Sequence, residues 1–430
     1  MQNNLISRAF ASLKQQPLVS ALSLIGSALA IFLIMVVVMT VNLPYSDLRP
    51  ETNKDRWLAY SYTTISNNNW GDGFNTSNGA TSFKTIKETI YSLTTPEEVT
   101  AFGTGFTTTP IAAAGGTPVP VLRKDVDDRF FKVFDFDWKS GEPFTREQFD
   151  SGVPVVVISA SVAKKLFGNT DVTGRQVELD HMPYRICGVV ADVPSVSHFT
   201  YGDVWVPFSA TTTIDDVWND GYMGRLSALI LARDKADFPA IREEYGKMLA
   251  KYNAQIGEAG WEIKRMGRPY DIEEELSAPW ANQEPDVKAL RKRHLITYAI
   301  LLLVPAVNLS SMTNSRLSRR AKEIGVRRAF GATRFEIMSD LFMENLVITV
   351  AAGLVGWLLS MIFALLFKET FFSATWGADD ITGVSVGSLM QWSTFGWALF
   401  FCFLLNLLSA GIPALQASRT NIVNALSGKK

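Results

Sequence analysis

The sequence has little of what metal, redox and nucleotide sites are usually built from. Among 430 residues there are three histidines, His181, His198 and His294, and two cysteines, Cys187 and Cys402. Their spacing matches no metal site, and Cys402 lies in an apolar run, which argues against a disulfide with Cys187. The phosphate-binding pattern G-x-x-x-x-G-K-[ST] is also absent. We therefore expect no catalytic residue, no metal and no cofactor bound by this chain.

Charged residues are missing from four long stretches, which are residues 15–46, 294–315, 345–367 and 381–418. Each stretch holds enough apolar residues to cross the hydrocarbon core of a bilayer, which takes about 20 residues of helix. Averages over the chain hide this segregation, since the mean hydropathy is only +0.10. The predicted transmembrane helices are residues 17–43, 294–315, 345–367 and 392–413.

Two of these predictions have alternatives. The second stretch contains Pro305 and Asn308, so it could instead be a buried core helix. The first could be a cleaved signal peptide, but its uncharged run exceeds the usual length of about 7 to 15 residues, and we interpret it as an uncleaved anchor. Ahead of it, apolar residues recur at helical spacing, which predicts an amphipathic helix over residues 1–16 on the inner membrane surface. A solvated start to the first span is the alternative.

Lys and Arg gather on one side of the predicted membrane. Residues 1–14, 316–344 and 414–430 together hold twelve Lys or Arg and only four Asp or Glu. Cytoplasmic loops near transmembrane spans carry such an excess. We therefore expect both termini and the 316–344 segment in the cytoplasm, with residues 44–293 and the short loop 368–391 on the other side.

Residues 44–293 are long enough for one or two folded domains. Beyond residue 119, segments typical of strands alternate with segments typical of helices. Predicted strands lie in "VPVLRKDV", "VPVVVIS", the hairpin "GRQVELDHMPYRICGVVADV" and "RLSALILARD"; predicted helices lie in "ASVAKKLFG", ending at Gly168, and "DFPAIREEYGKMLAKYN", with Pro239 in its first turn. The predicted fold is a membrane protein with four transmembrane helices and an α+β extracytoplasmic domain, or an α/β one, inserted between the first and second spans.

The N-terminal part of this domain gives weaker signals. "RWLAYSYTTI", residues 56–65, is rich in β-branched and aromatic residues and predicts a strand. The following "SNNNWGDGFNTSNGATS" collects turn residues and predicts a long loop or a hairpin excursion. Disorder is the alternative for that segment.

Two groups of polar residues invite a catalytic or metal-binding interpretation. Asp192, Ser195 and His198 would supply the chemistry of a hydrolase triad, but a triad is defined by spatial geometry, and polar residues of a surface loop are the simpler interpretation. The four acids of "YDIEEELSAP" are interpreted as a solvated face rather than a metal site.

Between the second and third predicted spans, "AKEIGVRRAFGATRFEI" covers residues 321–337. Its first half has the apolar spacing of a helix, and Gly331 is placed to end that helix. Thr333 and Glu336 then have the spacing of a capping box, in which the hydroxyl and the carboxylate bind backbone amides at a helix start. We predict a helix, a hinge at 331–332, and a second helix that enters the third span. A loop that merely orients the protein is the alternative.

Small residues recur every four positions in two of the predicted spans. They are Ala352, Gly356 and Ser360 in the third span and Gly26 and Ala30 in the first. This spacing lets two helix backbones approach closely. Packing within one chain and packing between copies are both compatible with it.

"EIGVRRAFGATRFEI", followed by "FMENLVITVAAGLVGWLLS", resembles the signature of the MacB/FtsX-like permeases of ABC transporters. The predicted order of an amphipathic start, one span, a large domain and three further spans is similar to that family. "DVDDRFFKVFDF" and "GVPVVVISASVAKKLFGN" resemble its external domain. "IPALQASRTNIVNAL" resembles its C-terminal tail, although Ile422 and Val423 stand where a proline is common. The resemblance is good over residues 119–240 and the last three spans and poor over 51–118.

The resemblance implies that residues 316–344 are a coupling segment on which a separate ATPase subunit docks. The implied docking residues are Lys322, Glu323, Ile324, Gly325, Arg327, Arg328, Gly331, Ala332, Thr333, Arg334 and Glu336. It also implies a bacterial inner membrane location with a periplasmic large domain and a cytoplasmic tail over residues 414–430. The implied partners are an ATPase dimer that uses ATP and Mg²⁺, a second permease copy or a related permease, a periplasmic adaptor and an outer-membrane channel.

Two functions fit this resemblance. In the first, the chain is the permease subunit of an exporter of a peptide, drug-like or lipid substrate, in which ATP hydrolysis by the partner moves the periplasmic domain. In the second, it transports nothing and is a transmembrane signal transmitter that regulates a periplasmic partner such as a cell-wall hydrolase. A sensor that works with a kinase is a third alternative.

Overall fold

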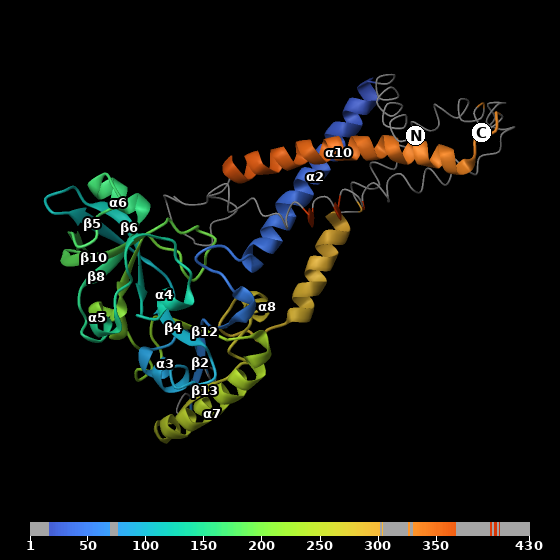
Figure 1. The fold of residues 1–430 in the computed structure, drawn as a ribbon. Helices are drawn as coiled ribbons and strands as arrows, with labels where there is room; N and C mark the ends of the chain where they lie inside the picture. Colours follow the sequence, from blue (N-terminus) through green and yellow to red (C-terminus); the bar gives the residue numbers. More distant parts are fainter. Residues whose placement is uncertain are drawn as a thin grey trace. The chain divides into compact units, whose positions relative to one another are not determined.

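The computed structural model describes residues 17–68, 76–301, 303, 326, 330–366, 396–397, 400–401 and 404 (Figure 1). The chain divides into two compact units. We call Tyr45–Leu290 the large domain, and the described helices of the other unit the helical unit. The predicted helix over residues 1–16, the loop 368–391 and the tail 414–430 lie outside the described residues.

The large domain mixes strands and helices along its length. Its strands are β1 (Trp57–Tyr60), β2 (Thr63–Asn67), β3 (Ser77–Gly79), β4 (Glu98–Gly103), β5 (Thr107–Ala113), β6 (Val119–Val126), β7 (Trp138–Gly141), β8 (Val155–Ser159), β9 (Gln176–Leu179), β10 (Met182–Val190), β11 (Val204–Pro207), β12 (Leu226–Leu231) and β13 (Trp261–Lys264). Its helices are α3 (Phe83–Thr89), α4 (Phe130–Val133), α5 (Arg146–Asp150), α6 (Ala160–Phe167), α7 (Phe238–Ile256) and α8 (Ile272–Ser277). The predicted α+β class is confirmed.

Six of these strands close into a barrel. Pairing runs from β5 to β6, β11, β8, β10 and β9, and β9 pairs with β5 again. Every strand of the ring contributes buried aliphatic side chains to one cluster, which includes Ile111, Val121, Ile158, Leu179 and Val206. The sheet continues beyond the barrel through β4, β12 and β1, and a separate small sheet has the order β13, β2, β3.

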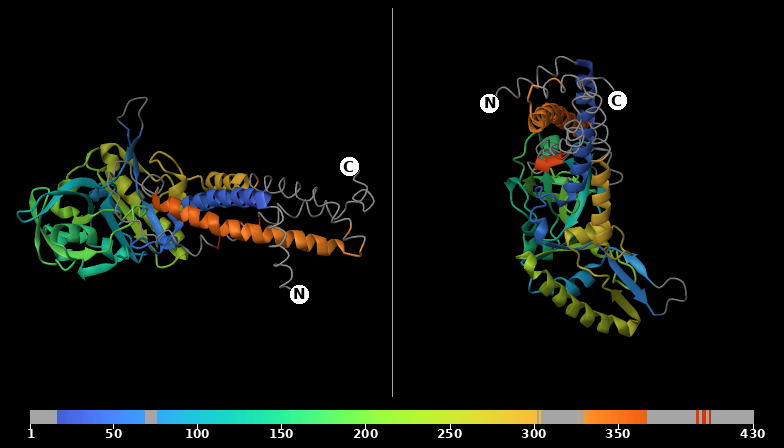
Figure 2. Two further views of the ribbon diagram at one scale, coloured as in Figure 1. Left: turned by 90° about the horizontal axis from the view of Figure 1, so that it is seen from above. Right: turned by 90° about the vertical axis from the view of Figure 1, so that its right-hand side faces the viewer.

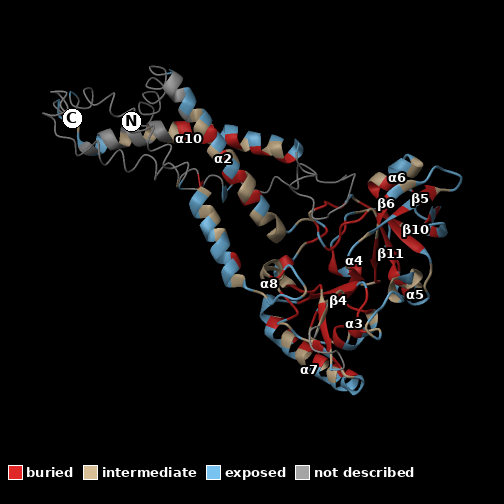
Figure 3. Cartoon of the chain, turned by 180° about the vertical axis from the view of Figure 1, so that it is seen from behind, coloured by how far each residue is buried: buried red, intermediate tan, exposed pale blue. Residues whose placement is uncertain are grey.

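The second core of the large domain is aromatic. Phe130 packs against Phe102 and Phe134, with ring centroids 5.7 and 4.7 Å apart, and Trp57 meets Phe134 edge-to-face at 5.3 Å. Such pairs add about 0.5–1.5 kcal/mol each beyond their burial. Buried residues accordingly concentrate on the strands and on the inner faces of their covering helices (Figure 3).

The predicted single strand over residues 56–65 is wrong, because the chain forms two strands there. β1 pairs with β12 in the large sheet, whereas β2 pairs with β13 in the small one. Between them the Ser61 carbonyl accepts a hydrogen bond from the Ser227 hydroxyl at 2.9 Å. A side chain thus takes the place of a ladder partner, and the strand is interrupted.

The other predicted elements beyond residue 119 form where expected. α6 ends at Gly168 in the left-handed conformation, with φ of 78°, and α7 carries a proline in its first turn. β9 and β10 form the predicted hairpin. β3 pairs with β2, so the turn-rich segment after residue 65 is flanked by paired strands.

In the helical unit, α2 (Pro17–Asn42) and α10 (Arg334–Leu366) pack against each other (Figures 1 and 2). Leu24–Tyr45 and Leu346–Leu366 are the two stretches of the described chain long and apolar enough to cross a membrane. Residues 287–301 are also helical, and the described residues of the fourth predicted span, such as Trp397 and Phe401, are helical as well. Most of the second and fourth predicted spans lies outside the described residues.

Small residues of α10 lie where the two helices meet. Ala352 and Ser360 are fully buried, and a Cβ added to Gly356 would lie 2.7 Å from the Ala28 carbonyl oxygen. The predicted α2 residues Gly26 and Ala30 are only partly buried. The contact on α2 is made by the neighbouring positions, chiefly Ala28 and Ile31.

We expect Gly356→Ala to lower the thermal stability of the detergent-solubilised chain. The new Cβ would meet the Ala28 carbonyl at 2.7 Å and Ile31 at 3.1 Å, so the helix backbones must separate. Overpacking of this kind costs about 1–3 kcal/mol, which exceeds the gain of about 1 kcal/mol in helix propensity. Gly396→Ala is the matched control, because a Cβ added there meets no atom of the described chain within 4 Å beyond its own neighbours in sequence. Equal melting temperatures for wild type and Gly356→Ala would contradict the close contact.

Candidate coupling segment and domain anchors

The described part of the coupling segment is a sharp turn that leads into α10. The Phe330 amide donates to the Val326 carbonyl at 3.1 Å, as in a last helical turn. Gly331 follows with φ of 94°, a conformation that costs other residues strain. Thr333 and Glu336 then bond reciprocally, through Thr333 N to Glu336 Oε2 at 2.9 Å and Glu336 N to Thr333 Oγ1 at 3.2 Å. The predicted break at Gly331 and the predicted capping box are confirmed, and α10 begins at Arg334.

The apolar side chains of this turn face solvent. Phe330 is 88% exposed and Phe335 79%, and Val326 is exposed too. Ala332 is half-buried. The remaining predicted docking residues, which are Lys322, Glu323, Ile324, Gly325, Arg327 and Arg328, are not among the described residues, and their role stays a prediction.

A buried ionic contact lies where the chain enters the large domain, and we call it the first anchor. It consists of Glu51, Lys54, Phe199 and Thr200. The Glu51 carboxylate accepts from the amides of Phe199 at 2.7 Å and Thr200 at 3.1 Å, and from the Thr200 hydroxyl at 3.2 Å. Its other oxygen pairs with Lys54 Nζ at 3.2 Å, and both side chains are under 10% exposed.

Further contacts hold the residues on either side of the first anchor. Asp47 accepts from the Lys54 amide at 3.0 Å, and Arg49 pairs with Asp135 at 2.9 Å. The Asp135 amide donates to the Pro50 carbonyl at 2.9 Å. The connection that follows α2 is thus bound to the large domain at several successive residues.

Lys124 on β6 is buried beside the first anchor. Its ammonium lies 5.3 Å from the centre of the Phe102 ring. Burial lowers the pKa of Lys124 to about 8, and the nearby Glu51 and Asp125 carboxylates oppose that shift. Asp125 is occupied by Arg123, at 2.9 Å, so Lys124 has no close ion pair within the described chain. This cation therefore costs stability when protonated.

The second anchor holds the chain where it leaves the large domain. It consists of Thr64, Arg268 and Ala281. The Arg268 guanidinium, 2% exposed, donates to Thr64 Oγ1 at 3.1 Å and to the Ala281 carbonyl. The Thr64 hydroxyl also donates to that carbonyl at 3.0 Å. Residue 281 therefore connects to strand β2 shortly before the 287–301 helix begins.

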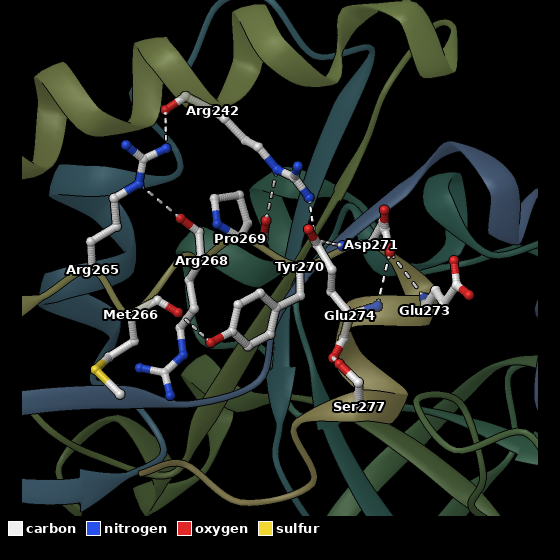
Figure 4. Close-up of polar contacts among 10 residues, drawn as sticks. All are labelled: Arg242, Arg265, Met266, Arg268, Pro269, Tyr270, Asp271, Glu273, Glu274 and Ser277. Atoms are coloured by element: carbon white, nitrogen blue, oxygen red, sulfur yellow. Dashed lines mark hydrogen bonds and ion pairs between the residues drawn. The ribbon is translucent and has the colours of Figure 1, made fainter. Parts of the chain in front are cut away.

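The acid run before this point is not a solvated face, and that interpretation was wrong. Asp271 caps α8 by accepting from the amides of Glu273 and Glu274, at 3.0 and 2.9 Å (Figure 4). Glu274 forms an ion pair with Arg242 of α7. Burial raises the pKa of Glu275, whose carboxylate accepts from the Ser61 hydroxyl. These acids hold α8 to its neighbours, which adjacency in the sequence does not reveal.

Figure 4 also shows Arg242 and Arg265, which bind carbonyls of α7 and of the 265–269 loop. Arg242 donates to the Pro269 carbonyl at 3.2 Å, and Arg265 donates to the carbonyls of Arg242 at 2.8 Å and Arg268 at 3.2 Å. α7, the 265–269 loop and α8 are thereby cross-linked by polar contacts. No group of His, Cys, Asp and Glu that could hold a metal occurs in the described ranges.

The polar residues of the 192–198 loop form no hydrolase triad. Asp192 accepts from the Ser161 amide at 2.9 Å, at the start of α6. The Ser195 hydroxyl is buried and has no hydrogen-bond partner among the described atoms, so it is not bonded to His198, which is exposed. Cys187 is a free thiol whose Sγ donates to the Val156 carbonyl at 3.4 Å.

The sequence patterns did not identify the residues of either anchor. Glu51 accepts from the Phe199 amide, 148 positions away, and Arg268 donates to Thr64 across 204 positions. The local signals are slight, since a Glu and a Lys three positions apart are common. Only the three-dimensional pairing distinguishes them from solvated charges.

Comparison with known families matches both parts of the chain. A MacB-like periplasmic core domain matches residues 20–247, and an FtsX-like permease C-terminal domain matches residues 295–422. An α+β domain joined to apolar helices, with these two matches in this order, defines a membrane-embedded ABC transporter permease. The chain belongs to the MacB/FtsX-like permease family.

Curated relatives are distant in sequence. The uncharacterized ABC transporter permease YknZ of Bacillus subtilis is 24% identical over 304 residues, 70% of this chain and 68% of that protein. The macrolide export ATP-binding/permease protein MacB of Bdellovibrio bacteriovorus is 25% identical over 66% of this chain, and that of Salmonella paratyphi A 22% over 73%. The chain spans only 40% and 44% of those two proteins.

Solved structures of related domains also match. The periplasmic region of MacB from Actinobacillus actinomycetemcomitans is 17% identical, covers 48% of this chain and 89% of that one, and has a TM-score of 0.31. A domain of a permease protein from Porphyromonas gingivalis is 18% identical, covers 55% and 97%, and has a TM-score of 0.35.

Removing the Glu51 charge should strongly destabilise the large domain. Glu51→Gln removes the carboxylate charge that pairs with the buried Lys54 ammonium, and breaking a buried pair in this way costs on the order of 3–5 kcal/mol. The double variant Glu51→Gln, Lys54→Met should lose less free energy of unfolding than the single variant. Denaturant unfolding of the full chain, followed by tryptophan fluorescence, measures both.

Asp135→Asn provides the control for that cycle. The Arg49–Asp135 pair is 64% and 48% exposed, so its loss should cost less than about 1 kcal/mol. Equal losses for Glu51→Gln and Asp135→Asn would contradict a buried first anchor.

The buried Lys124 should make stability rise with pH above pH 8. Its folded pKa of about 8 lies below the ordinary value of 10.5, so between these values the unfolded chain holds a proton that the folded chain lacks. Lys124→Met removes this titratable group. The stability advantage of the variant over wild type should shrink by about 2 kcal/mol between pH 7.5 and 9.5. Parallel pH profiles for the two proteins would show that Lys124 does not titrate in this range.

Proposed function

We propose that this chain is the permease subunit of an ABC transporter that couples ATP hydrolysis by a separate ATPase subunit to movement of its large domain, and so exports a peptide, drug-like or lipid substrate. The family requires an ATPase partner. In this proposal a dimer of that subunit binds ATP and Mg²⁺, and this chain supplies the surface on which the dimer docks. The printed names of two relatives, macrolide export proteins, make a hydrophobic drug-like cargo a reasonable first test.

The observation that carries this proposal is the turn at Gly331. It joins an exposed apolar side chain, Phe330, to the start of α10 without any flexible connection, since Thr333 caps the helix two residues later. A partner that binds Val326 and Phe330 would therefore displace α10 itself. Rigid transfer of a displacement along a helix is an established way to couple distant sites.

The contacts of α10 would pass its displacement on toward the large domain. Gly356 brings α10 against α2, and the connection after α2 is held by the first anchor at Glu51. A shift of α2 would act on a part of the large domain that is fixed by directional hydrogen bonds. This supports movement of the domain as a unit, in which substrate need not cross the bilayer.

The proposed setting follows the family. We place the chain in the bacterial inner membrane as a multi-pass protein with cytoplasmic termini and a periplasmic large domain. A second permease copy or a related permease completes the transporter, and a periplasmic adaptor and an outer-membrane channel receive the cargo.

Gly331→Pro should leave membrane insertion intact and reduce ATP hydrolysis by the partner to its unstimulated rate. Proline holds φ near −65° and cannot adopt the 94° of this position, so the turn must rearrange. Gly168→Pro is the matched control, because Gly168 also has a positive φ, 78°, and open surroundings but ends α6. ATPase activity of the reconstituted complex is the measurement.

Glu323→Ala should have the same effect as Gly331→Pro if the segment docks the ATPase. Undiminished stimulation in both variants would refute the docking role. Normal stimulation by wild type without any cargo export from proteoliposomes, but with activation of a cell-wall hydrolase, would favour the signal transmitter instead.

A further inference from the structure

The exposed face of helix 287–301 changes from basic to apolar along its length. Lys288, Lys292 and Arg293 are exposed in its first two turns. From the third turn the exposed side chains are Leu295, Ile296 and Ile300, which are 69%, 48% and 57% exposed. The charged and apolar parts therefore follow one another on the same helix.

Each of the three cations shares a side of the helix with apolar residues. Arg293 projects within about 60° of Ile296 and Ile300. At 100° per residue, Lys288, Lys292 and Leu295 project within about 60° of one another. Leu290 projects from the opposite side and is 5% exposed. The basic side chains thus lead directly onto a surface suited to lipid chains.

Nothing in the described chain neutralises these three cations. Lys288, Lys292 and Arg293 form no ion pair or hydrogen bond with any described residue. The acids that precede them are Glu284 and Asp286, and Asp286 accepts from the Ala289 amide at 2.9 Å as a helix cap. Three exposed cations that have no ion pair within the described part of the chain suit an anionic ligand.

The spacing matches the headgroup layer of a bilayer. A helix rises about 1.5 Å per residue, so Lys292 lies about 4.5 Å and Lys288 about 10 Å beyond Leu295. The polar layer on each side of the hydrocarbon core is about 5–7 Å thick. With Leu295 at the edge of the core, Lys292 and Arg293 lie within that layer, and the long Lys288 side chain can reach it.

Orientation of the protein does not explain these charges. The uncharged run 294–315 follows them, and the basic 316–344 segment lies at its other end. Positive residues that set topology belong on the cytoplasmic side only. A cluster at the opposite end of the same run needs a local reason.

We propose that Lys288, Lys292 and Arg293 bind the phosphates of anionic phospholipid headgroups, in the membrane leaflet on the side of the large domain. The contact fixes the depth at which this helix enters the membrane. It is independent of ATPase docking, because it involves no residue of the coupling segment. Each Lys or Arg at an anionic surface contributes about a fivefold preference for it.

The test uses the full chain in phosphatidylcholine vesicles that contain a photoreactive phosphatidylglycerol. Crosslinks mapped by mass spectrometry to residues 284–303 should fall at least about tenfold in the variant Lys288→Gln, Lys292→Gln, Arg293→Gln. The matched control, Lys132→Gln, Lys164→Gln, Lys165→Gln, removes three exposed lysines of the large domain and should leave them unchanged. A photoreactive phosphatidylcholine should label this stretch weakly.

A charge-retaining variant keeps the test decisive if the neutral one folds poorly. Lys288→Arg, Lys292→Arg, Arg293→Lys should label as wild type does. Equal labelling by the two lipids, or unchanged labelling in the neutral variant, would overturn the proposal. So would efficient crosslinking between cysteines placed at 288 or 292 in two copies of the chain, which would make a second copy the partner. Stimulated ATP hydrolysis is measured separately and reports on the coupling segment alone.

Discussion

The carboxylate of Glu51 is the contact on which the attachment of the large domain depends. An ionised carboxylate inside a protein is tolerated only when its oxygens are fully satisfied, and Glu51 meets this condition with two amides, one hydroxyl and the Lys54 ammonium. Those groups come from the connection after α2 and from the loop that leads into β11. Neither segment can move away without leaving a buried charge unpaired. The position of the connection is therefore fixed by electrostatics rather than by apolar burial alone.

The α2–α10 contact works by a different principle. Gly356 allows the α10 backbone to approach the Ala28 carbonyl, and the packing of Ala352 and Ser360 extends the contact. In a bilayer there is no hydrophobic drive between helices, so close van der Waals packing of small residues takes its place. This contact holds the two backbones close together through shape rather than through directional bonds. A polar anchor adds hydrogen bonds, which are directional.

What the sequence predicts well is what neighbouring residues determine. The Thr333–Glu336 capping box, the end of α6 at Gly168 and the buried strand β8 all follow from patterns a few residues long. The anchors depend on partners far away in the chain, and no periodicity of the sequence predicts them. The same reason explains the error at Ser61, where a distant side chain interrupts a strand. It also explains the error in the acid run, whose partners lie on α7 and in the β1–β2 connection.

Both connections of the large domain are held by buried charge. At the first, Glu51 binds Lys54 and two backbone amides; at the second, Arg268 binds Thr64 and the Ala281 carbonyl. An apolar contact would tolerate sliding of either connection along the domain surface, whereas each of these contacts has a single geometry that satisfies its charge. In the mechanism that we propose, the domain follows the movement of a membrane helix. Slack in either connection would then absorb the displacement before the domain moved, and the two anchors limit such slack.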